Sequence, residues 1–156
     1  MEQPVDEPMA QPVALPRTYR PLGARVATAM AAVILVSSMS FLWVMLPGSV
    51  QAQFAIAQRL TLVLFLIVML VVLNAMFRTS AHADDGGLTI TNGYRVRRFS
   101  WPEVLGVSLG SSHPWAMVDL ADGTTVALMA IQGSDGARAR RAAHELAAVI
   151  ASRTSG

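Results

Sequence analysis

The sequence predicts a membrane α-helical hairpin joined to a small α+β domain, and three observations carry this prediction. Apolar residues make up 53% of the 156 residues and charged residues only 14%, against roughly 25% charged residues in soluble domains. The apolar excess lies in two uncharged stretches, residues 26–46 and 60–77. Farther along, the pattern changes first to the alternation typical of strands and then to a helical period. We therefore divide the chain into a tail over residues 1–24, a hairpin over 25–78 and a domain over 84–152.

The tail is rich in proline, which recurs about every four residues. Proline fixes φ and removes a backbone donor, so this spacing prevents a regular helix. Acidic residues come first in the tail, and Arg17 and Arg20 follow them. We expect an extended, disordered tail on the cytoplasmic side of the membrane.

Two stretches are predicted to cross the membrane. Residues 26–46 contain 21 residues without a charge, and residues 60–77 contain 18. A helix rises about 1.5 Å per residue, so the first stretch spans roughly 31 Å, the thickness of a bilayer core. Pro47 and Gly48 follow the first stretch, and such a pair ends a helix. The connection is short, which makes the two helices an antiparallel hairpin.

Arginine placement predicts the orientation of the hairpin. Arg17, Arg20 and Arg25 precede the first stretch and Arg78 follows the second, whereas the connection holds only Arg59, at its end. Positive residues concentrate on the cytoplasmic side of such proteins. We therefore expect a multi-pass protein of the inner membrane with both termini in the cytoplasm.

A cleaved signal at the first stretch is the alternative. Residues 50–52 resemble a signal-peptidase site, and cleavage there would leave a single-span protein with an exported domain. The apolar core is long for a signal and the leader is acidic, which disfavours cleavage. The chain has no cysteine. This favours a cytoplasmic location of the domain, because small exported domains often use disulfides.

The domain is predicted to begin with five strands, over residues 88–91, 94–99, 104–109, 115–120 and 124–129. Asn92-Gly93 between the first two is the strongest short-range signal for a β hairpin. Asp122-Gly123 marks a second tight turn. Ser100-Trp101-Pro102-Glu103 predicts a one-turn corner, since proline suits the first position of a helix.

One amphipathic helix is predicted after Gly133. Ser134 or Asp135 can accept the first free backbone N–H groups as its N-cap. The apolar residues that fall on one face are Ala139, Ala142, Ala143, Leu146, Val149 and Ile150. This helix would cover an open end of the curled sheet, which otherwise exposes its apolar interior.

Four short motifs carry a resemblance to a known family: GLTI at residues 87–90, RRFSWPEV at 97–104, LADG at 120–123 and AIQ at 130–132. They resemble the short bacterial PH-like domains, above all those of actinobacterial low-molecular-weight antigen proteins, which also place a transmembrane hairpin before the domain. The resemblance covers about residues 60–152. It implies a PH-like antiparallel split barrel capped by a C-terminal helix, and it implies no established activity.

Two groups of arginines are candidate contacts for lipid or for a partner protein. Arg95 and Arg97 share one face of a strand and Arg98 lies on the other, since side chains alternate. Their position resembles the phosphoinositide-binding position of eukaryotic PH domains. Near an anionic leaflet each arginine contributes on the order of 1 kcal/mol to the free energy of membrane binding. Arg138 and Arg141 form a second basic group near the start of the terminal helix.

Other conspicuous residues are assigned structural roles. Trp101 and Pro102 form the predicted corner, where the Trp101 ring closes the core and its N–H reaches a loop carbonyl. Asp122 and Gly123 form a turn. The three histidines lie in different elements without metal-ligand spacing, and neither a catalytic constellation nor a cofactor motif is present.

We therefore predict a non-catalytic, membrane-anchored PH-like interaction module. It would bind another protein or a membrane complex on the cytoplasmic face. The alternative is a domain that binds anionic lipid through its basic strand face. A formal net charge of +2 is far below the excess expected of a nucleic-acid-binding protein. The sequence leaves self-association of the hairpin open.

Overall fold

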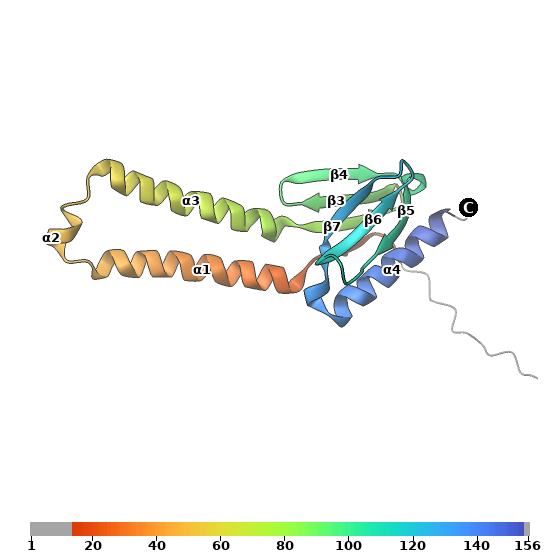
Figure 1. The fold of residues 1–156 in the computed structure, drawn as a ribbon, viewed down its shortest axis with the longest axis horizontal. Helices are drawn as coiled ribbons and strands as arrows, with labels where there is room; N and C mark the ends of the chain where they lie inside the picture. Colours follow the sequence, from red (N-terminus) through yellow and green to blue (C-terminus); the bar gives the residue numbers. More distant parts are fainter. Residues whose placement is uncertain (1–13, 155–156) are drawn as a thin grey trace, which may run out of the picture.

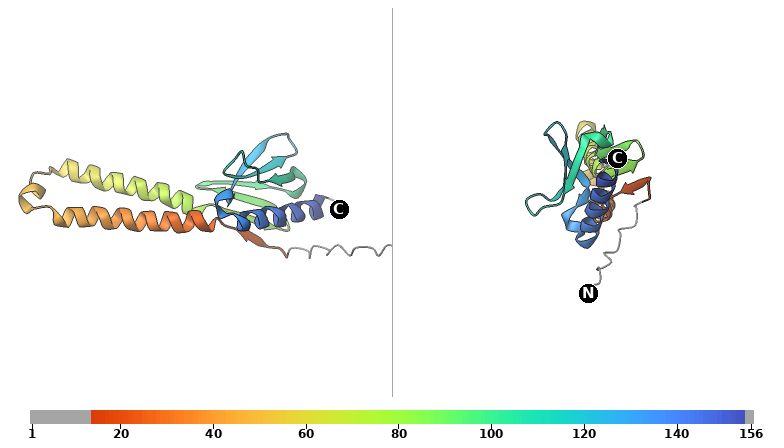
Figure 2. Two further views of the ribbon diagram at one scale, coloured as in Figure 1. Left: turned by 60° about the horizontal axis from the view of Figure 1, so that its bottom comes forward. Right: turned by 90° about the vertical axis from the view of Figure 1, so that its right-hand side faces the viewer.

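The computed structural model describes residues 14–154, and the rest of the predicted tail lies outside this part of the chain. Figure 1 shows two antiparallel helices that extend as a long arm from a small domain of strands with one helix packed along it. The views in Figure 2 show the same arm and domain from two further directions. The predicted fold class is thereby confirmed: two long apolar helices and antiparallel sheets capped by a C-terminal helix.

The arm consists of α1 (Leu22–Met45), the short helix α2 (Gly48–Gln51) and α3 (Ile56–Arg78). The helices α1 and α3 are long and apolar enough to span a membrane. Almost none of their residues is buried, 6% of the apolar window in α1 and 0% in α3. This pattern is typical of a helix surrounded by lipid rather than of an amphipathic surface helix.

The first long helix begins earlier than residue 26, the predicted start. Pro21 has extended backbone angles, with φ −73° and ψ 108°, and the helix starts at Leu22 directly after it. Arg25 therefore lies inside α1, and its guanidinium carbon sits 4.9 Å from the centre of the Phe77 ring on α3. This cation–π contact joins the two helices where they enter the domain.

Within residues 14–154, seven strands form two antiparallel sheets. The first sheet has the order β1-β2-β3-β4 and the second β5-β6-β7. Their bounds are β1 Arg17–Tyr19, β2 Ser80–Asp84, β3 Gly87–Asn92, β4 Arg95–Phe99, β5 Val104–Ser108, β6 Trp115–Leu120 and β7 Thr125–Gln132. The prediction of five strands is therefore wrong, because it lacks β1 and β2.

The strand β1 corrects the prediction that residues 1–24 form a disordered tail. Arg17 pairs with Ala83, and Tyr19 pairs with Ala81. Pro16 and Pro21 flank this strand, which is tolerated because β1 is at the edge of its sheet, where a missing backbone donor breaks no ladder. The helical hairpin is thus inserted between the first two strands of the domain (Figure 1).

The strand β2 moves the start of the domain from residue 84 back to Ser80. Its sequence alternates, but the buried positions are occupied by Ala81 and Ala83. Alanine is depleted in strands, so the pattern carried little strand signal. The small side chains let Tyr19, a buried residue of β1, lie beside them in the core.

The turn between β3 and β4 is displaced by one residue from the predicted Asn92-Gly93. Asn92 pairs with Arg95, so Gly93 and Tyr94 form the turn. Gly93 has φ +65°, which favours glycine. Asn92 is freed to join the two sheets: its Nδ2 donates to the Ala127 carbonyl at 2.6 Å, and its Oδ1 accepts from the Met129 N–H at 3.3 Å.

The terminal helix α4 (Ala137–Thr154) packs against β5 and β7. Its buried face is the predicted one, with Ala139, Ala143, Leu146, Val149 and Ile150. These residues complete a core whose largest enclosed side chains include Leu88, Ile90, Val104, Val118, Leu128 and Ile131. The predicted N-cap is wrong: the Gly136 carbonyl accepts the Arg140 N–H at 3.2 Å, and Asp135 points elsewhere.

Candidate functional site

The arginines predicted on the strand are divided between the two faces of β4. Arg95 and Arg97 lie on the same face as the buried Ile90, which pairs with Arg97. The two arginines line a groove of about 390 Å³, together with Ala75 and Met76 at the end of α3. Arg98 faces the other side and lines a hollow beside His82. The structure therefore brings together Arg95 and Arg97 but separates Arg98 from them.

We call Arg95 and Arg97 the strand cluster. Both side chains are exposed, and among the described residues neither forms an ion pair. The opposite wall of their groove is β7, from Thr125 to Met129. Two unpaired guanidinium groups beside apolar residues at the base of α3 can bind an anionic group that carries an apolar part.

The β3–β4 turn holds the strand cluster against the hairpin. The Tyr94 hydroxyl lies 3.2 Å from the Val71 carbonyl and 3.3 Å from Asn74 Oδ1, both on α3, and its one proton is shared between these acceptors. The Arg78 guanidinium lies 5.5 Å from the centre of the Tyr94 ring. A tyrosine with its polar tip against a helix end is typical of a membrane–water interface.

The second basic group is larger than predicted. Arg138 and Arg141 of α4 line a hollow of about 540 Å³ together with Arg17 and Arg20. We call these four residues the helix cluster. Arg17 donates to Glu145 at 3.2 Å, an exposed ion pair worth about 0–1 kcal/mol. Sequence reasoning missed Arg17 and Arg20 because it placed them in a tail, although their position just before the first span was a usable signal.

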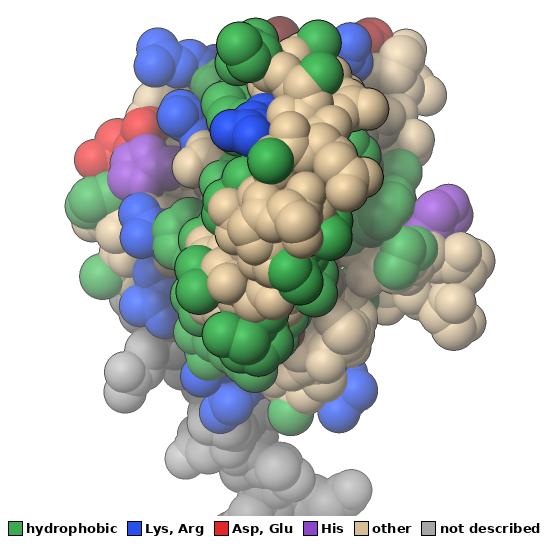
Figure 3. All heavy atoms as spheres, turned by 90° about the vertical axis from the view of Figure 1, so that its left-hand side faces the viewer, with side chains coloured by type: hydrophobic (Ala, Val, Ile, Leu, Met, Phe, Trp, Pro, Cys, Tyr) green, Lys and Arg blue, Asp and Glu red, His purple; other side chains and the backbone are tan. Residues whose placement is uncertain are grey.

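Both clusters lie at the base of the hairpin. Figure 3 looks along the hairpin from its α2 end and shows arginine side chains on several sides of the central hydrophobic arm. The groove of the strand cluster includes the last turns of α3. The helix cluster is lined by β1, which runs into α1. This placement is suited to contact with charged groups at a membrane surface.

Asp135 connects the helix cluster to the hairpin. Its carboxylate oxygens accept the Leu22 and Gly23 backbone N–H groups, each at 3.1 Å. These are free donors of the first turn of α1, and a carboxylate there also complements the helix dipole. Asp135 therefore caps α1 across a separation of more than one hundred residues in the chain, instead of capping α4.

We expect Asp135→Ala to destabilise the chain by about 1 kcal/mol, as loss of an N-cap does. A Cβ on Gly23 would lie 2.6 Å from Asp135 Oδ1, so Gly23→Ala displaces the carboxylate and should also destabilise. In the Asp135→Ala background the same change should stabilise, because alanine is the better helix former. Thermal unfolding in detergent measures this cycle, and additive effects would contradict the capping role.

Tyr19 is the buried titratable group beside the helix cluster. Its side chain is 6% exposed, and its hydroxyl has no hydrogen-bond partner among the described residues. Burial raises the pKa of Tyr19 from 10.0 to about 12, and Glu145 adds to this while Arg17 opposes it. Burial of an unpaired hydroxyl costs free energy in the folded state.

We expect Tyr19→Phe to raise stability by about 1 kcal/mol at neutral pH, because it removes the unpaired hydroxyl. The folded pKa is raised, so the proton-linked stability is present below pH 10 and is lost as the pH rises toward about 12. The unfolding temperature of the wild type should fall over this window more steeply than that of Tyr19→Phe. Parallel curves for the two proteins would contradict the burial of a protonated hydroxyl.

The residues assigned structural roles hold the domain's corners. Trp101 is 5% exposed, and its Nε1 donates to the Asp84 carbonyl at 3.0 Å. It opens a short 3-10 helix with Pro102 and Glu103. The Glu103 carboxylate accepts the Ser100 hydroxyl at 2.6 Å and the Ser100 N–H at 2.7 Å. These bonds, the hydroxyl first, lower the pKa of Glu103.

The second turn is built in the same way. Asp122 Oδ1 accepts the Thr124 hydroxyl at 2.7 Å and the Thr124 N–H at 2.8 Å. Both bonds lower the pKa of Asp122, and Gly123 has φ +80°. Within residues 14–154 no group of three or more His, Asp or Glu side chains could hold a metal ion.

Comparisons with known proteins agree with this architecture. Residues 78–148 match a family model described as a bacterial PH domain. The match runs from β2 into α4 and leaves out β1 and nearly all of the hairpin. Residues 78–148 are thus similar to a bacterial PH domain, and two long apolar helices precede most of this stretch.

Two relatives match about half of the chain. The uncharacterized proteins Rv1417 of Mycobacterium tuberculosis and Mb1452 of Mycobacterium bovis are each 35% identical over 74 residues, which is 47% of this chain and 48% of the relative. The chain thus spans about half the length of the curated relatives it matches. No solved structure matches the chain.

Proposed function

We propose that this chain is a non-catalytic, membrane-anchored PH-like module of the actinobacterial low-molecular-weight antigen type. Its helices α1 and α3 cross the inner membrane, and both termini are cytoplasmic. The domain binds another membrane protein or complex through the open edges of its sheets. Neither a cofactor nor a nucleic acid is needed for this function.

The position of β1 supports the two-span arrangement. Because β1 and β2 are neighbours in one sheet, both helices must leave the domain on the same side. Cleavage after Ala52 would remove β1 and with it the buried Tyr19. The sheet would then expose Ala81 and Ala83 at a new edge, so an exported, cleaved form is disfavoured. A cytoplasm-specific reporter fused after Gly156 tests the orientation.

The observation that carries partner binding is a set of exposed apolar side chains on two edge strands. Among residues 80–154 the exposed large hydrophobic side chains are Tyr94, Val96 and Leu105, at 56%, 56% and 60% exposure. Val96 lies on β4 and Leu105 on β5, and these strands are edges of the two sheets. An edge with apolar side chains is a template for an added strand from a partner.

Mild-detergent purification of the full chain from its native membranes tests this function. We expect a stoichiometric partner with the wild type and its loss with Val96→Glu, which puts a charge on the edge. Ser111→Glu adds the same charge to an exposed loop and should retain the partner. Retention of the partner by Val96→Glu, or its loss from both variants, would contradict binding at this edge.

The strand cluster favours a second function, binding of anionic lipid. Arg95 and Arg97 share the groove at the base of α3 and have no ion-pair partner among the described residues. Lipid headgroups at a membrane surface lie at this level of the hairpin. Each arginine contributes on the order of 1 kcal/mol near an anionic leaflet.

Native mass spectrometry of the detergent-solubilised chain with added phosphatidylglycerol tests this second function. We expect the double variant Arg95→Gln/Arg97→Gln to bind one phosphatidylglycerol fewer per chain than the wild type, because about 2 kcal/mol of binding free energy is lost at this groove. Arg98→Gln removes one charge from the opposite face of β4 and should retain as much as the wild type. Equal retention by all three proteins would contradict lipid binding by the strand cluster.

A further inference from the structure

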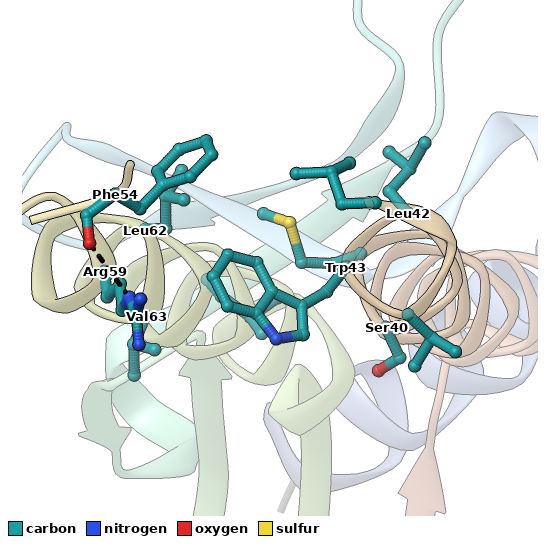
Figure 4. Close-up of a pocket in the computed structure, with 11 residues that line it drawn as sticks. Ser40, Leu42, Trp43, Phe54, Arg59, Leu62 and Val63 are labelled. Atoms are coloured by element: carbon teal, nitrogen blue, oxygen red, sulfur yellow. Dashed lines mark hydrogen bonds between the residues drawn. The ribbon is translucent and has the colours of Figure 1, made fainter. Parts of the chain in front are cut away.

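The far end of the hairpin, away from the domain, contains an apolar cavity of about 570 Å³ between α1 and α3. Figure 4 shows Trp43 reaching from α1 into the space between the helices, with Phe54 and Arg59 on the opposite side. The remaining lining residues are apolar except Ser40. A cavity of this size is within the range of small-ligand sites, which is about 300–1,000 Å³.

Arg59 is the charged residue of this cavity. Its Nε donates to the Phe54 carbonyl at 3.1 Å, and its Nη2 donates to the Gln51 carbonyl at 2.8 Å. The guanidinium carbon lies 5.6 Å from the centre of the Trp43 ring. A guanidinium has five N–H donors, so three of them have no acceptor among the described residues.

The connection between the helices fixes Arg59 in place. Gln51 donates from its side chain to the Trp43 and Leu46 carbonyls, each at 3.0 Å. The Phe54 ring packs edge-on against Trp43, with 5.8 Å between ring centres. The cation, the aromatic rings and the connecting backbone therefore form one preorganised rim of the cavity.

No carboxylate among the described residues forms an ion pair with Arg59. The sequence contains no Asp or Glu between Glu7 and Asp84, so the whole hairpin carries arginines without a carboxylate. Beside a bilayer a cation with free donors pairs with an anionic headgroup. An apolar cavity with one such cation at its rim has the two parts of a site for an amphiphile.

We propose that this cavity binds one anionic phospholipid, with an acyl chain between α1 and α3 and the phosphate at Arg59. This site lies at the opposite end of the hairpin from the strand and helix clusters. It rests on the proposed crossing of the bilayer by both helices. A second copy of the hairpin is a poorer occupant, because it brings the same arginines and no carboxylate to neutralise Arg59.

The test uses the full chain reconstituted in vesicles whose lipids carry brominated acyl chains, which quench nearby tryptophan fluorescence. Trp43 is one of three tryptophans, and its signal is the difference between the wild type and Trp43→Phe. We expect brominated phosphatidylglycerol to quench Trp43 at about fivefold lower mole fraction than brominated phosphatidylcholine. Arg59→Gln should abolish this difference and retain quenching by phosphatidylcholine.

Arg25→Gln is the matched control, because Arg25 makes the corresponding cation–π contact at the other end of the hairpin. It should keep the fivefold preference, and this result together with the Arg59→Gln result supports the site. Equal quenching by both lipids, or a preference that survives Arg59→Gln, would overturn it. Trp43 shielded from both lipids at high protein density but not on dilution would assign the cavity to a second copy. Absence of quenching by either lipid at any density would instead overturn the crossing of the bilayer.

Discussion

Gly87→Ala should destabilise the domain by about 3 kcal/mol or more, because two unfavourable effects add at one position. Gly87 has φ +150°, a backbone conformation that residues with a side chain rarely adopt. A Cβ there would lie 2.0 Å from the Phe99 carbonyl oxygen and 3.0 Å from Ser100 Cα. Both are backbone atoms, one at the end of β4 and one directly after it, so no side-chain rotation relieves the contact and β3 must move away from β4.

Gly123→Ala is the matched control for this prediction. Gly123 also has a positive φ, +80°, but no atom lies within 4 Å of its added Cβ. Its substitution should cost only about 1 kcal/mol for the backbone conformation. Thermal unfolding of the two variants in detergent gives the comparison. Equal losses of stability would show that the close approach of Phe99 to Gly87 does not determine the stability of the β3–β4 pair.

The parts of the fold that local patterns predict are those whose neighbours are close in sequence. The uncharged stretches predict α1 and α3, and strand alternation predicts β3 to β7 in order. The buried face of α4 follows from its helical period, with Leu146 and Ile150 inward. In each case the deciding signal is a repeat within one element.

The parts that the sequence did not predict depend on contacts between distant segments. The strand β1 has only three residues, and it pairs with β2 across the entire hairpin. Asp135 is a residue type typical of an N-cap and lies just before α4, yet its carboxylate accepts hydrogen bonds from the start of α1. No local pattern distinguishes these partners, because their proximity follows from the fold as a whole.

The same limit applies to the candidate site. Arg95 and Arg97 were predicted together, because two residues apart on a strand share a face. Arg17 and Arg20 join Arg138 and Arg141 only once β1 lies beside α4. Insertion of the hairpin into the domain therefore places two basic clusters at its base.

Trp101→Ala should lower the free energy of unfolding by about 3–5 kcal/mol, the range for deletion of a buried aromatic side chain. The ring is 5% exposed and belongs to the core cluster that contains Leu88 and Val104. Its loss leaves a cavity at the corner between the two sheets, where β4 ends and β5 begins. It also leaves the Asp84 carbonyl without the indole donor that now binds it at 3.0 Å.

Two further variants separate these causes. Trp101→Phe keeps an aromatic ring and removes the donor, so its smaller loss of about 1–2 kcal/mol reports mainly on the unpaired carbonyl. Trp115→Ala deletes the same side chain at a half-buried position and should cost less than Trp101→Ala. Chemical unfolding of the three variants ranks them. A Trp101→Ala protein as stable as Trp115→Ala would mean that the corner is held by the Ser100–Glu103 hydrogen bonds and not by the buried indole.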